Sequence, residues 1–392
     1  MRPVFLLLAE SPLSASPRAY RLSLALLALY PHTPLFVLSP PPCPLSPSVS
    51  FFGFPPLDKS LLEATKITHY TAQKHFSPLL FTPNRLELAR QLNQLETRLA
   101  RQKIYIKAVF VQDLALLPTL VEYTRLPNLI VDLREFYPAL VNPQHFSVPL
   151  FHHICTHYLS YALKSLSVNA SIAQLYAQNY PHFNPAHNLI WHSTPFYANL
   201  HPSPLSPPMR LLYHGLVAKE RDSHNLLDLA QGLKDLPLPY HLSLMVLSKH
   251  PAFFQDFKAR VTHLQAQGVP IQLLKPVGFL EIIPASQPFD LGLLSLPNNS
   301  LNHLYALPNK FFEYIQSALG VISTPLMEVK ALLETHQMGI TSPDFSHASL
   351  LETLASLDMD QIRHYKQQAS QAAKLLCMQA QLPNLARFLS DL

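Results

Sequence analysis

Short apolar segments that are typical of buried strands alternate with helical segments along most of the sequence. Residues 4–9 form such a strand segment, residues 16–30 have helical spacing, and residues 34–38 form a second strand segment. A strand, a helix and a strand at this spacing begin a parallel sheet whose strands are joined by crossover helices. The same alternation begins again at residue 209. The sequence therefore predicts an α/β protein.

A proline-rich segment divides the chain into two parts. Residues 201–208 contain four prolines in eight positions, which can continue neither a helix nor a central strand. A chain of 392 residues is also too long for one ordinary hydrophobic core. We therefore expect a domain over residues 1–200, a linker at 201–208, a second domain at 209–360 and a terminal helical segment at 361–392.

Cysteine usage and hydrophobicity predict a cytoplasmic protein. The three cysteines are odd in number and far apart, which argues against a disulfide framework and against a zinc site: Cys43, Cys155 and Cys377. Residues 22–38 come nearest to a membrane span, but a Tyr-Pro-His sequence interrupts them. The amino terminus imitates a signal peptide, although Glu10 and two prolines interrupt it, and a first buried strand explains it equally well.

Basic residues are concentrated in the first part of the chain. Residues 1–208 contain 15 lysines and arginines against 9 acidic residues, whereas residues 209–392 contain 14 against 15. A helix expected from Thr82-Pro83 carries Arg90, Arg98 and Arg101 away from its leucine stripe. The excess predicts an anionic partner, such as the inner face of a membrane, a phosphorylated lipid or an acidic glycan, while a basic surface that keeps the protein soluble remains equally open.

Glycine is concentrated in the second part. Gly53 is the only one of the 8 glycines before residue 209. Because glycine permits close approach of the backbone, we expect ligand contact mainly in the second domain.

Residues 289–325 read as a strand, a loop, a helix and a strand, and they contain the main candidate site. Asn309, Lys310 and Glu313 fall in the opening turn of the helix, where free backbone N–H groups and the helix dipole favour an anion. A lysine and a carboxylate one turn apart suit a nucleotide, with Lys310 toward a phosphate and Glu313 toward ribose hydroxyls. A surface lysine and glutamate on an amphipathic helix are the alternative.

The sequence Leu-Asn-x-x-Tyr-Ala-Leu-Pro-Asn-Lys-Phe-Phe-Glu-Tyr at residues 301–314 resembles the donor-binding segment of GT-B glycosyltransferases, of the retaining family four or group one type. The resemblance implies two Rossmann-like, doubly wound parallel-sheet domains that face a cleft, with a carboxyl-terminal helix that crosses back to the first domain. It implies transfer of a sugar, with retention, from a UDP- or GDP-sugar to a glycan or lipid-linked acceptor in cell-surface polysaccharide or lipopolysaccharide synthesis. A non-catalytic glycan-binding or partner module and a nucleotide-sugar epimerase of the same fold remain alternatives.

The resemblance also assigns roles to single residues. Tyr213-x-Gly215 followed by Arg221 matches the family's turn that grips the donor phosphates, and we expect Arg221 and Lys310 to line one crevice with Glu313. Pairing of Arg221 with a neighbouring acidic residue is the alternative. Segments similar to Asp132-x-x-Glu135-x-Tyr-Pro line the acceptor side in the family, so Glu135 is the candidate for orienting or deprotonating an acceptor hydroxyl.

Three departures from the family pattern concern the donor site. Tyr305 stands where the family commonly has the first of two glutamates, so its contact with the donor sugar is lost or replaced by a hydroxyl. Residues 318–320 replace the usual Gly-x-Pro, and the loop after the first strand has no glycine. Arg18 and Arg21 follow the family's basic residues in the next helix, although a solvated helix face explains them as readily.

Three histidines at helical spacing invite a metal interpretation: His152, His153 and His157. No His-Glu-x-x-His sequence accompanies them, and 20 histidines make chance clusters common. Stabilising a departing diphosphate with cations and helix N–H groups needs no metal. We therefore expect neither a metal nor another cofactor, with the nucleotide-sugar as substrate.

Overall fold

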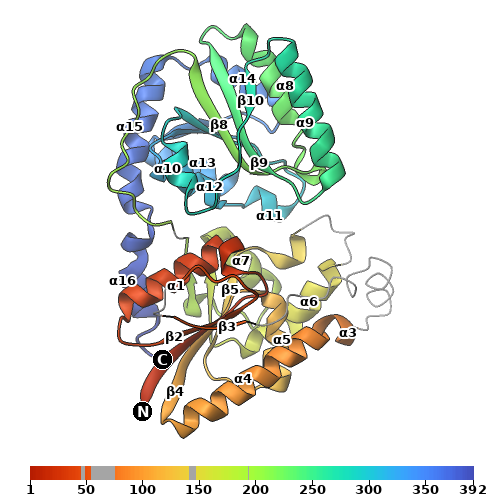
Figure 1. Cartoon of the computed structure of the whole chain (residues 1–392), viewed down its shortest axis with the longest axis vertical. Helices are drawn as coiled ribbons and strands as arrows, with labels where there is room; N and C mark the ends of the chain where they lie inside the picture. The colour runs from red at the N-terminus through yellow and green to blue at the C-terminus, as the bar shows by residue number, and fades with distance from the viewer. Residues whose placement is uncertain (46–48, 54–75, 141–146, 193) are drawn as a thin grey trace. The chain divides into compact units, whose positions relative to one another are not determined.

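The computed structural model describes residues 1–45, 49–53, 76–140, 147–192 and 194–392. The chain forms two compact units. The first comprises Met1–Ser193 together with Gln381–Leu392, and the second comprises Thr194–Ala380. Each unit contains one parallel sheet between helices, which confirms the predicted fold class of two α/β domains with parallel sheets (Figure 1).

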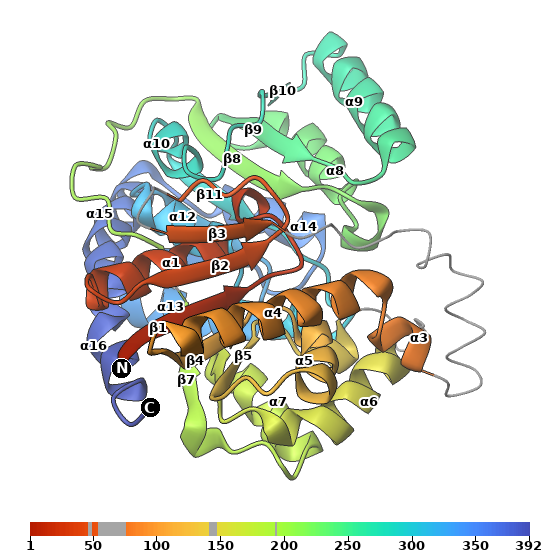
Figure 2. The ribbon, with the colours of Figure 1, turned by 60° about the horizontal axis from the view of Figure 1, so that its bottom comes forward.

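The sheet of the first unit has, among the described residues, seven strands in the order β3-β2-β1-β4-β5-β6-β7. Figure 2 shows β1, β2 and β3 as neighbouring strands. The bounds are β1 Arg2–Leu8, β2 Leu35–Ser39, β3 Val49–Gly53, β4 Ile104–Val111, β5 Leu129–Leu133, β6 Lys164–Ser167 and β7 Asn188–Ile190. The central strand β1 is buried from Val4 to Leu8, as expected for a strand covered on both faces.

The helices of the first unit connect these strands. They are α1 Pro17–Leu29, α3 Ser77–Leu80, α4 Pro83–Arg101, α5 Leu117–Tyr123, α6 Ser147–Tyr158 and α7 Ala170–Asn179. Short 3₁₀ helices lie at η1 Leu13–Ala15, η3 Leu114–Leu116, η4 Tyr137–Ala139, η5 Leu159–Tyr161 and η6 Pro185–His187. The expected cap of α4 is present, because the Thr82 hydroxyl accepts a hydrogen bond from the Arg85 N–H at 3.4 Å.

The sheet of the second unit has six strands in the order β10-β9-β8-β11-β12-β13. Their bounds are β8 Met209–Leu216, β9 Tyr240–Leu247, β10 Ile271–Leu273, β11 Leu291–Leu294, β12 Gly320–Ser323 and β13 Gly339–Thr341. The order reverses at β8 and β11, and in open α/β sheets ligands bind at the carboxyl ends of strands beside such a reversal.

Helices pack on both faces of this second sheet. On one face α8 contacts α9 and α14, and on the other α12 contacts α10 and α15 (Figure 1). The bounds are α8 Asn225–Gly232, α9 Pro251–Ala266, α10 Ile282–Ser286, α11 Leu301–Leu304, α12 Asn309–Gln316, α13 Met327–His336, α14 His347–Ala355, α15 Met359–Leu375 and α16 Met378–Phe388, with 3₁₀ helices η7 Lys219–Arg221 and η8 Leu233–Asp235. Helix α15 contacts β12 and belongs to the second unit, whereas α16 from Gln381 onward and the last residues belong to the first.

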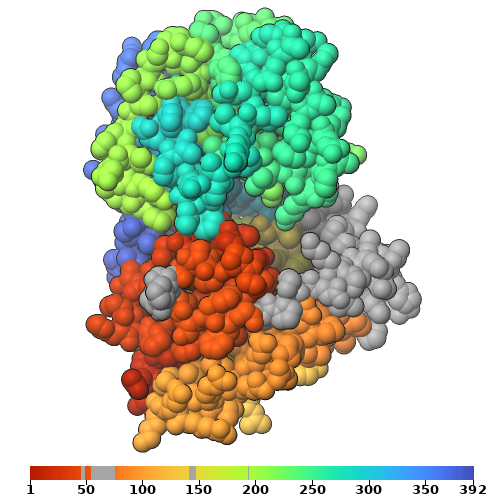
Figure 3. Space-filling view, viewed as in Figure 1, coloured from red at the N-terminus to blue at the C-terminus, as the bar shows by residue number. Residues whose placement is uncertain are grey.

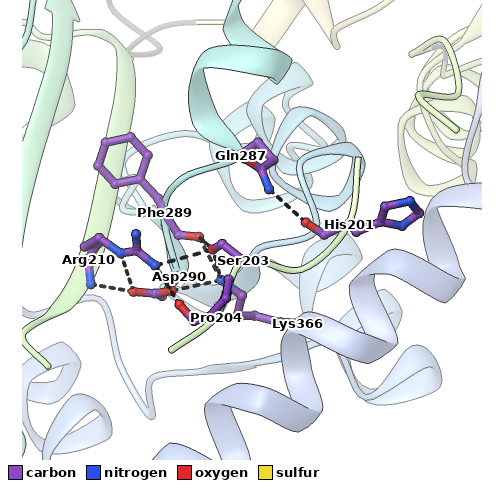
Figure 4. Close-up of polar contacts among 8 residues, drawn as sticks. All are labelled: His201, Ser203, Pro204, Arg210, Gln287, Phe289, Asp290 and Lys366. Atoms are coloured by element: carbon purple, nitrogen blue, oxygen red, sulfur yellow. Dashed lines mark hydrogen bonds and ion pairs between the residues drawn. The ribbon is translucent and has the colours of Figure 1, made fainter. Parts of the chain in front are cut away.

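Residues 201–208, predicted as the linker, belong to the second unit and are held on it by a buried charge cluster (Figure 4). Asp290, which is 0 % exposed, accepts hydrogen bonds from the Arg210 guanidinium at 2.8 and 2.9 Å and from Lys366 at 2.9 Å. Lys366 also donates to the Ser203 hydroxyl, and Arg210 donates to the Pro204 carbonyl at 3.0 Å. Burial works to raise the pKa of Asp290, but the hydrogen bonds from both cations outweigh it and hold that pKa below its usual value. The cluster thus joins the proline-rich segment, β8, β11 and α15.

The uneven distribution of glycine has a packing cause that the sequence did not predict. An ideal Cβ on Gly292 would lie 2.3 Å from the Tyr314 ring, and one on Gly339 would lie 2.0 Å from the Val321 carbonyl oxygen. Both glycines therefore permit close packing within the second unit rather than approach to a ligand.

Strand β3 is the outermost strand of the first sheet among the described residues. Its residues are mostly exposed at the edge of the sheet, so they show no strong apolar alternation. No helix in the described part of the chain is long and apolar enough to cross a bilayer.

Candidate functional site

The carboxyl end of β8 brings the backbone close to a lysine from α12. Gly215 has a φ of 118°, which side-chain-bearing residues rarely adopt, and an ideal Cβ there would lie 3.3 Å from Lys310 Nζ. The group beside Gly215 is thus the Lys310 ammonium, and contact of Gly215 with donor phosphates stays a prediction.

Lys310 is buried and has no hydrogen-bond acceptor among the described residues. The residue is 8 % exposed, and its Nζ lies 3.9 Å from the centroid of the Tyr213 ring. The ring face stabilises the cation but offers no lone pair in the manner of an oxygen. Burial lowers the pKa of Lys310 and the charge of Arg221 lowers it further, whereas Tyr213 and the charge of Glu313 oppose this. An anion beside Lys310 would raise this pKa again.

Glu313 lies one turn further along α12 and is 3 % exposed. Its Oε2 is 3.7 Å from Nε2 of His214, the residue between Tyr213 and Gly215. Burial and the nearby Lys310 charge lower the pKa of His214 to about 3, so the imidazole is neutral at physiological pH. The sequence predicted that Lys310 and Glu313 line a crevice, and in the structure both side chains are more buried than that prediction implied.

Arg221 ends the short η7 helix after β8. Asp222 follows with a left-handed φ of 47°, and the Ser223 hydroxyl accepts a hydrogen bond from the Ala218 N–H at 3.0 Å, so the loop turns sharply. In the part of the chain that the structure describes, Arg221 forms no ion pair with either acidic neighbour, the alternative left open by the sequence. Its charge acts instead on Lys310 and on His303 of α11.

Tyr305 and Asn309 flank the start of α12. Tyr305 follows α11, whose first turn is capped by the Ser300 hydroxyl, which accepts a hydrogen bond from the His303 N–H at 3.1 Å. Asn309 is the exposed first residue of α12. The same unit therefore holds all the predicted donor-binding residues: Gly215, Arg221, Tyr305, Asn309, Lys310 and Glu313.

Glu135 lies in the first unit, after β5. Its carbonyl oxygen accepts a hydrogen bond from the Tyr176 hydroxyl at 2.9 Å, and its side chain is partly exposed. The adjacent Arg134 pairs with Asp113 at 2.9 Å. The catalytic role of Glu135 remains a prediction.

The loop after β1 and the start of α1 contain ion pairs of their own. Arg18 binds both oxygens of buried Asp132, at 2.7 to 2.9 Å. Arg21 is 2 % exposed, so neither arginine lies on a solvated helix face. Glu10, in the loop after β1, pairs with Arg85 at 2.6 Å.

Sequence reasoning assigned no role to the Tyr213 ring and did not name His214. The Tyr-x-Gly pattern pointed to this turn, but it did not show that the ring supports Lys310 or that the middle residue approaches Glu313. The described residues also contain no cluster of three or more histidine, cysteine or acidic side chains arranged to hold a metal ion. His152 instead contacts the Tyr180 hydroxyl at 2.9 Å.

No protein-family model matches the sequence, and no curated protein matches it at the sequence level. Solved structures match over the full length. The UDP-forming α,α-trehalose-phosphate synthase from Burkholderia vietnamiensis matches with a TM-score of 0.68 and 10 % identity, over 100 % of both chains. HepE (Alr3699) from Anabaena, in complex with UDP-glucose, matches with a TM-score of 0.65 and 14 % identity, over 100 % of both chains. WaaG, a glycosyltransferase involved in lipopolysaccharide biosynthesis, matches with a TM-score of 0.62 and 12 % identity, over 99 % of this chain and 100 % of its own. These matches confirm the GT-B fold.

Proposed function

We propose that the protein is a retaining glycosyltransferase that moves a sugar from a nucleoside-diphosphate donor, such as a UDP-sugar, to a hydroxyl of a glycan or lipid-linked acceptor. One observation carries the proposal: the Lys310 ammonium is buried beside Gly215, near Arg221, with no hydrogen-bond acceptor among the described residues. Burying an ammonium without a partner costs several kcal/mol, so a site of this kind is built for an anion.

The position of the lysine agrees with a diphosphate as that anion. Lys310 is the second residue of α12, where backbone N–H groups and the helix dipole add to its positive charge. Arg221 supplies a second cation on a separate loop, so two charges can bind two phosphoryl groups. The matching HepE structures contain UDP-glucose, UDP, or UDP with glucose, which supports a UDP-sugar as the donor.

The proposed reaction breaks the bond between the anomeric carbon and the diphosphate oxygen. The acceptor hydroxyl oxygen bonds to the same face of that carbon, its proton passes to the Glu135 carboxylate, and the nucleoside diphosphate departs as an anion. Lys310 and Arg221 stabilise the charge on the leaving group, and Glu313 accepts hydrogen bonds from the ribose hydroxyls. Glu135 is the proposed residue for orienting or deprotonating the acceptor.

Thermal stability in the presence of nucleotides tests donor binding. UDP and UDP-glucose should raise the melting temperature of the full chain, and neither Lys310→Ala nor Glu313→Ala should respond. His152→Ala, which changes the first unit, is the matched control and should respond like wild type. If no nucleoside diphosphate or nucleotide-sugar shifts the melting temperature, the protein is a non-catalytic module and the proposal is wrong.

Release of free nucleotide tests turnover. With a glycan or lipid-linked acceptor present, the wild-type protein should release UDP, and Glu135→Gln should lower kcat while leaving the affinity for UDP unchanged. Binding of UDP without release in the presence of any acceptor from cell-surface polysaccharide or lipopolysaccharide synthesis would contradict the transferase.

An anionic membrane is the proposed location of the acceptor. Helix α4 lies on the surface of the first unit, in orange in Figure 3. Arg98 and Arg101 are exposed on it, whereas Arg90 is paired with Glu87 at 2.6 Å. We expect sedimentation with vesicles that contain anionic lipid, weakened by added salt and by Arg98→Gln with Arg101→Gln.

A further inference from the structure

His214 is a buried side chain in the donor site that the proposed mechanism does not use. Its Nε2 has no hydrogen-bond partner among the described residues, and the residue is 3 % exposed. A buried nitrogen without a partner is costly, so its neighbours indicate what it does. The carboxylate of Glu313 lies 3.7 Å away, slightly too far for a hydrogen bond.

Contacts with α12 fix the position of His214. Its backbone N–H donates to the Tyr314 hydroxyl at 3.2 Å, and that hydroxyl donates to the Leu293 carbonyl at 3.1 Å. The two rings also meet edge to face, with centroids 4.8 Å apart. Since Tyr314 follows Glu313 in the same helix, the imidazole and the carboxylate are held by one element, and a shift of less than 1 Å would join them.

We infer that His214 is a positioning residue: its Nε2–H donates a hydrogen bond to the Glu313 carboxylate and fixes the orientation in which that carboxylate accepts from the donor ribose. The inference rests on the proposed function, because it assigns a role to Glu313 in nucleotide binding. A carboxylate that accepts from an N–H on one side has its remaining lone pairs aimed in a fixed direction.

The protonation state of His214 agrees with this role. The low pKa keeps the ring neutral, so one nitrogen carries a proton and the other does not. A carboxylate beside Nε2 favours the tautomer with the proton on that nitrogen. The charged Lys310 nearby also disfavours an imidazolium at His214.

The test compares UDP with 2′,3′-dideoxy-UDP, which lacks the hydroxyls that Glu313 would accept from. Calorimetric titration of the full chain should show about 10-fold or greater loss of UDP affinity for His214→Phe, since hydrogen bonds to charged groups contribute on that scale. The affinity for the dideoxy analogue should not change. His214→Gln, which keeps an N–H donor, should recover most of the affinity for UDP.

The neighbouring strand supplies a matched control. His241 lies at the amino end of β9, opposite Arg210, whereas His214 lies at the carboxyl end of β8. His241→Phe should leave both affinities at wild-type values. Equal loss for both nucleotides in His214→Phe would indicate a purely structural role and overturn the inference, as would no loss for either.

Failure of the inference can be separated from failure of the proposed function. If wild type binds UDP, Glu313→Ala weakens that binding and His214→Phe does not, only the role of His214 is wrong. If wild type binds neither nucleotide, the proposed function and this inference fail together. Should His214→Phe not fold, His214→Gln and His214→Asn still give the comparison between the two nucleotides.

Discussion

Two buried lysines in the second unit should respond in opposite directions to the same substitution. Lys310 is 8 % exposed and its ammonium has no acceptor among the described residues. Lys366 is 1 % exposed and donates to Ser203, to the Phe289 carbonyl and to Asp290 at 2.8, 2.8 and 2.9 Å. Methionine keeps most of the length of either side chain and removes only the charge.

For Lys366→Met we expect a loss of stability. Removing one member of a buried ion pair costs about 3–5 kcal/mol when the remaining charge is left alone. Arg210 still binds both oxygens of Asp290, so the remaining carboxylate is compensated (Figure 4). The expected loss is therefore about 2–3 kcal/mol, mainly from the charge-assisted hydrogen bonds.

For Lys310→Met we expect a gain of stability. The buried amine lacks a hydrogen bond, a defect that costs about 1–3 kcal/mol even in its neutral form and more when charged. The cation–π contact with the Tyr213 ring stabilises the charged form by up to about 2 kcal/mol. The balance predicts a gain of about 1–2 kcal/mol, together with loss of binding to UDP.

Differential scanning calorimetry measures both effects in one transition, because both lysines belong to the second unit. For a unit of this size each kcal/mol shifts the melting temperature by about 2–4 °C. Lys310→Met should therefore melt about 2–8 °C higher than wild type, and Lys366→Met about 4–12 °C lower. Lys330→Met is the control, because that side chain is 52 % exposed and should change stability by less than about 0.5 kcal/mol. A shift of the same sign for both buried lysines would refute the reasoning, since it would mean that Lys310 has a stabilising partner.

Three further predictions concern the residues around Lys310. The pKa of His214 is about 3 in the folded protein and about 6.5 in the unfolded chain, so the second unit should lose stability as the pH falls below about 6.5. The loss should reach about 2 kcal/mol near pH 5. Urea unfolding of His214→Gln should lack this pH-dependent loss. Gly215→Ala should lower the free energy of unfolding by about 1–3 kcal/mol because of its φ of 118°, and calorimetric titration should show weaker UDP binding because the new methyl group lies against Lys310. Arg221→Ala should weaken UDP about 10-fold or more but leave uridine unaffected, and an equal loss for uridine would show that Arg221 does not contact phosphate.

The sequence predicted local structure well where one element carries its own signal. The turn at Thr82-Pro83 opens α4, and the strands on either side of α12 are β11 and β12 as expected. The sequence was a poorer guide where two serines could each cap the same helix. Ser349 and Glu352 resemble a capping box, but Ser346 caps α14 through the Ser349 N–H at 3.1 Å, three residues earlier.

Ion pairs between residues far apart in the chain could not be predicted from the sequence. Arg18 reads as an exposed helix residue, yet its guanidinium binds Asp132, 114 positions away. Nothing in the sequence around Arg210 or Lys366 indicates that both bind Asp290. No local pattern indicates which charge will be buried, because burial is decided by the strand order and not by the neighbouring residues.

The burial of Lys310 follows from glycines on two strands rather than from its own helix. Gly292 in β11 leaves room for the Tyr314 ring, which would otherwise meet a Cβ at 2.3 Å, and this lets α12 pack directly on the sheet. Gly215 in β8 leaves room at the point that the Lys310 ammonium reaches. A side chain at Gly292 would clash with the Tyr314 ring and force α12 away from the sheet, and one at Gly215 would press on the Lys310 ammonium. In water an ammonium binds phosphate more weakly, because solvent screens it. The two glycines and the Lys-x-x-Glu-Tyr sequence of α12 therefore act together: the helix supplies the charge, and the strands supply the low dielectric that makes this charge effective toward a diphosphate.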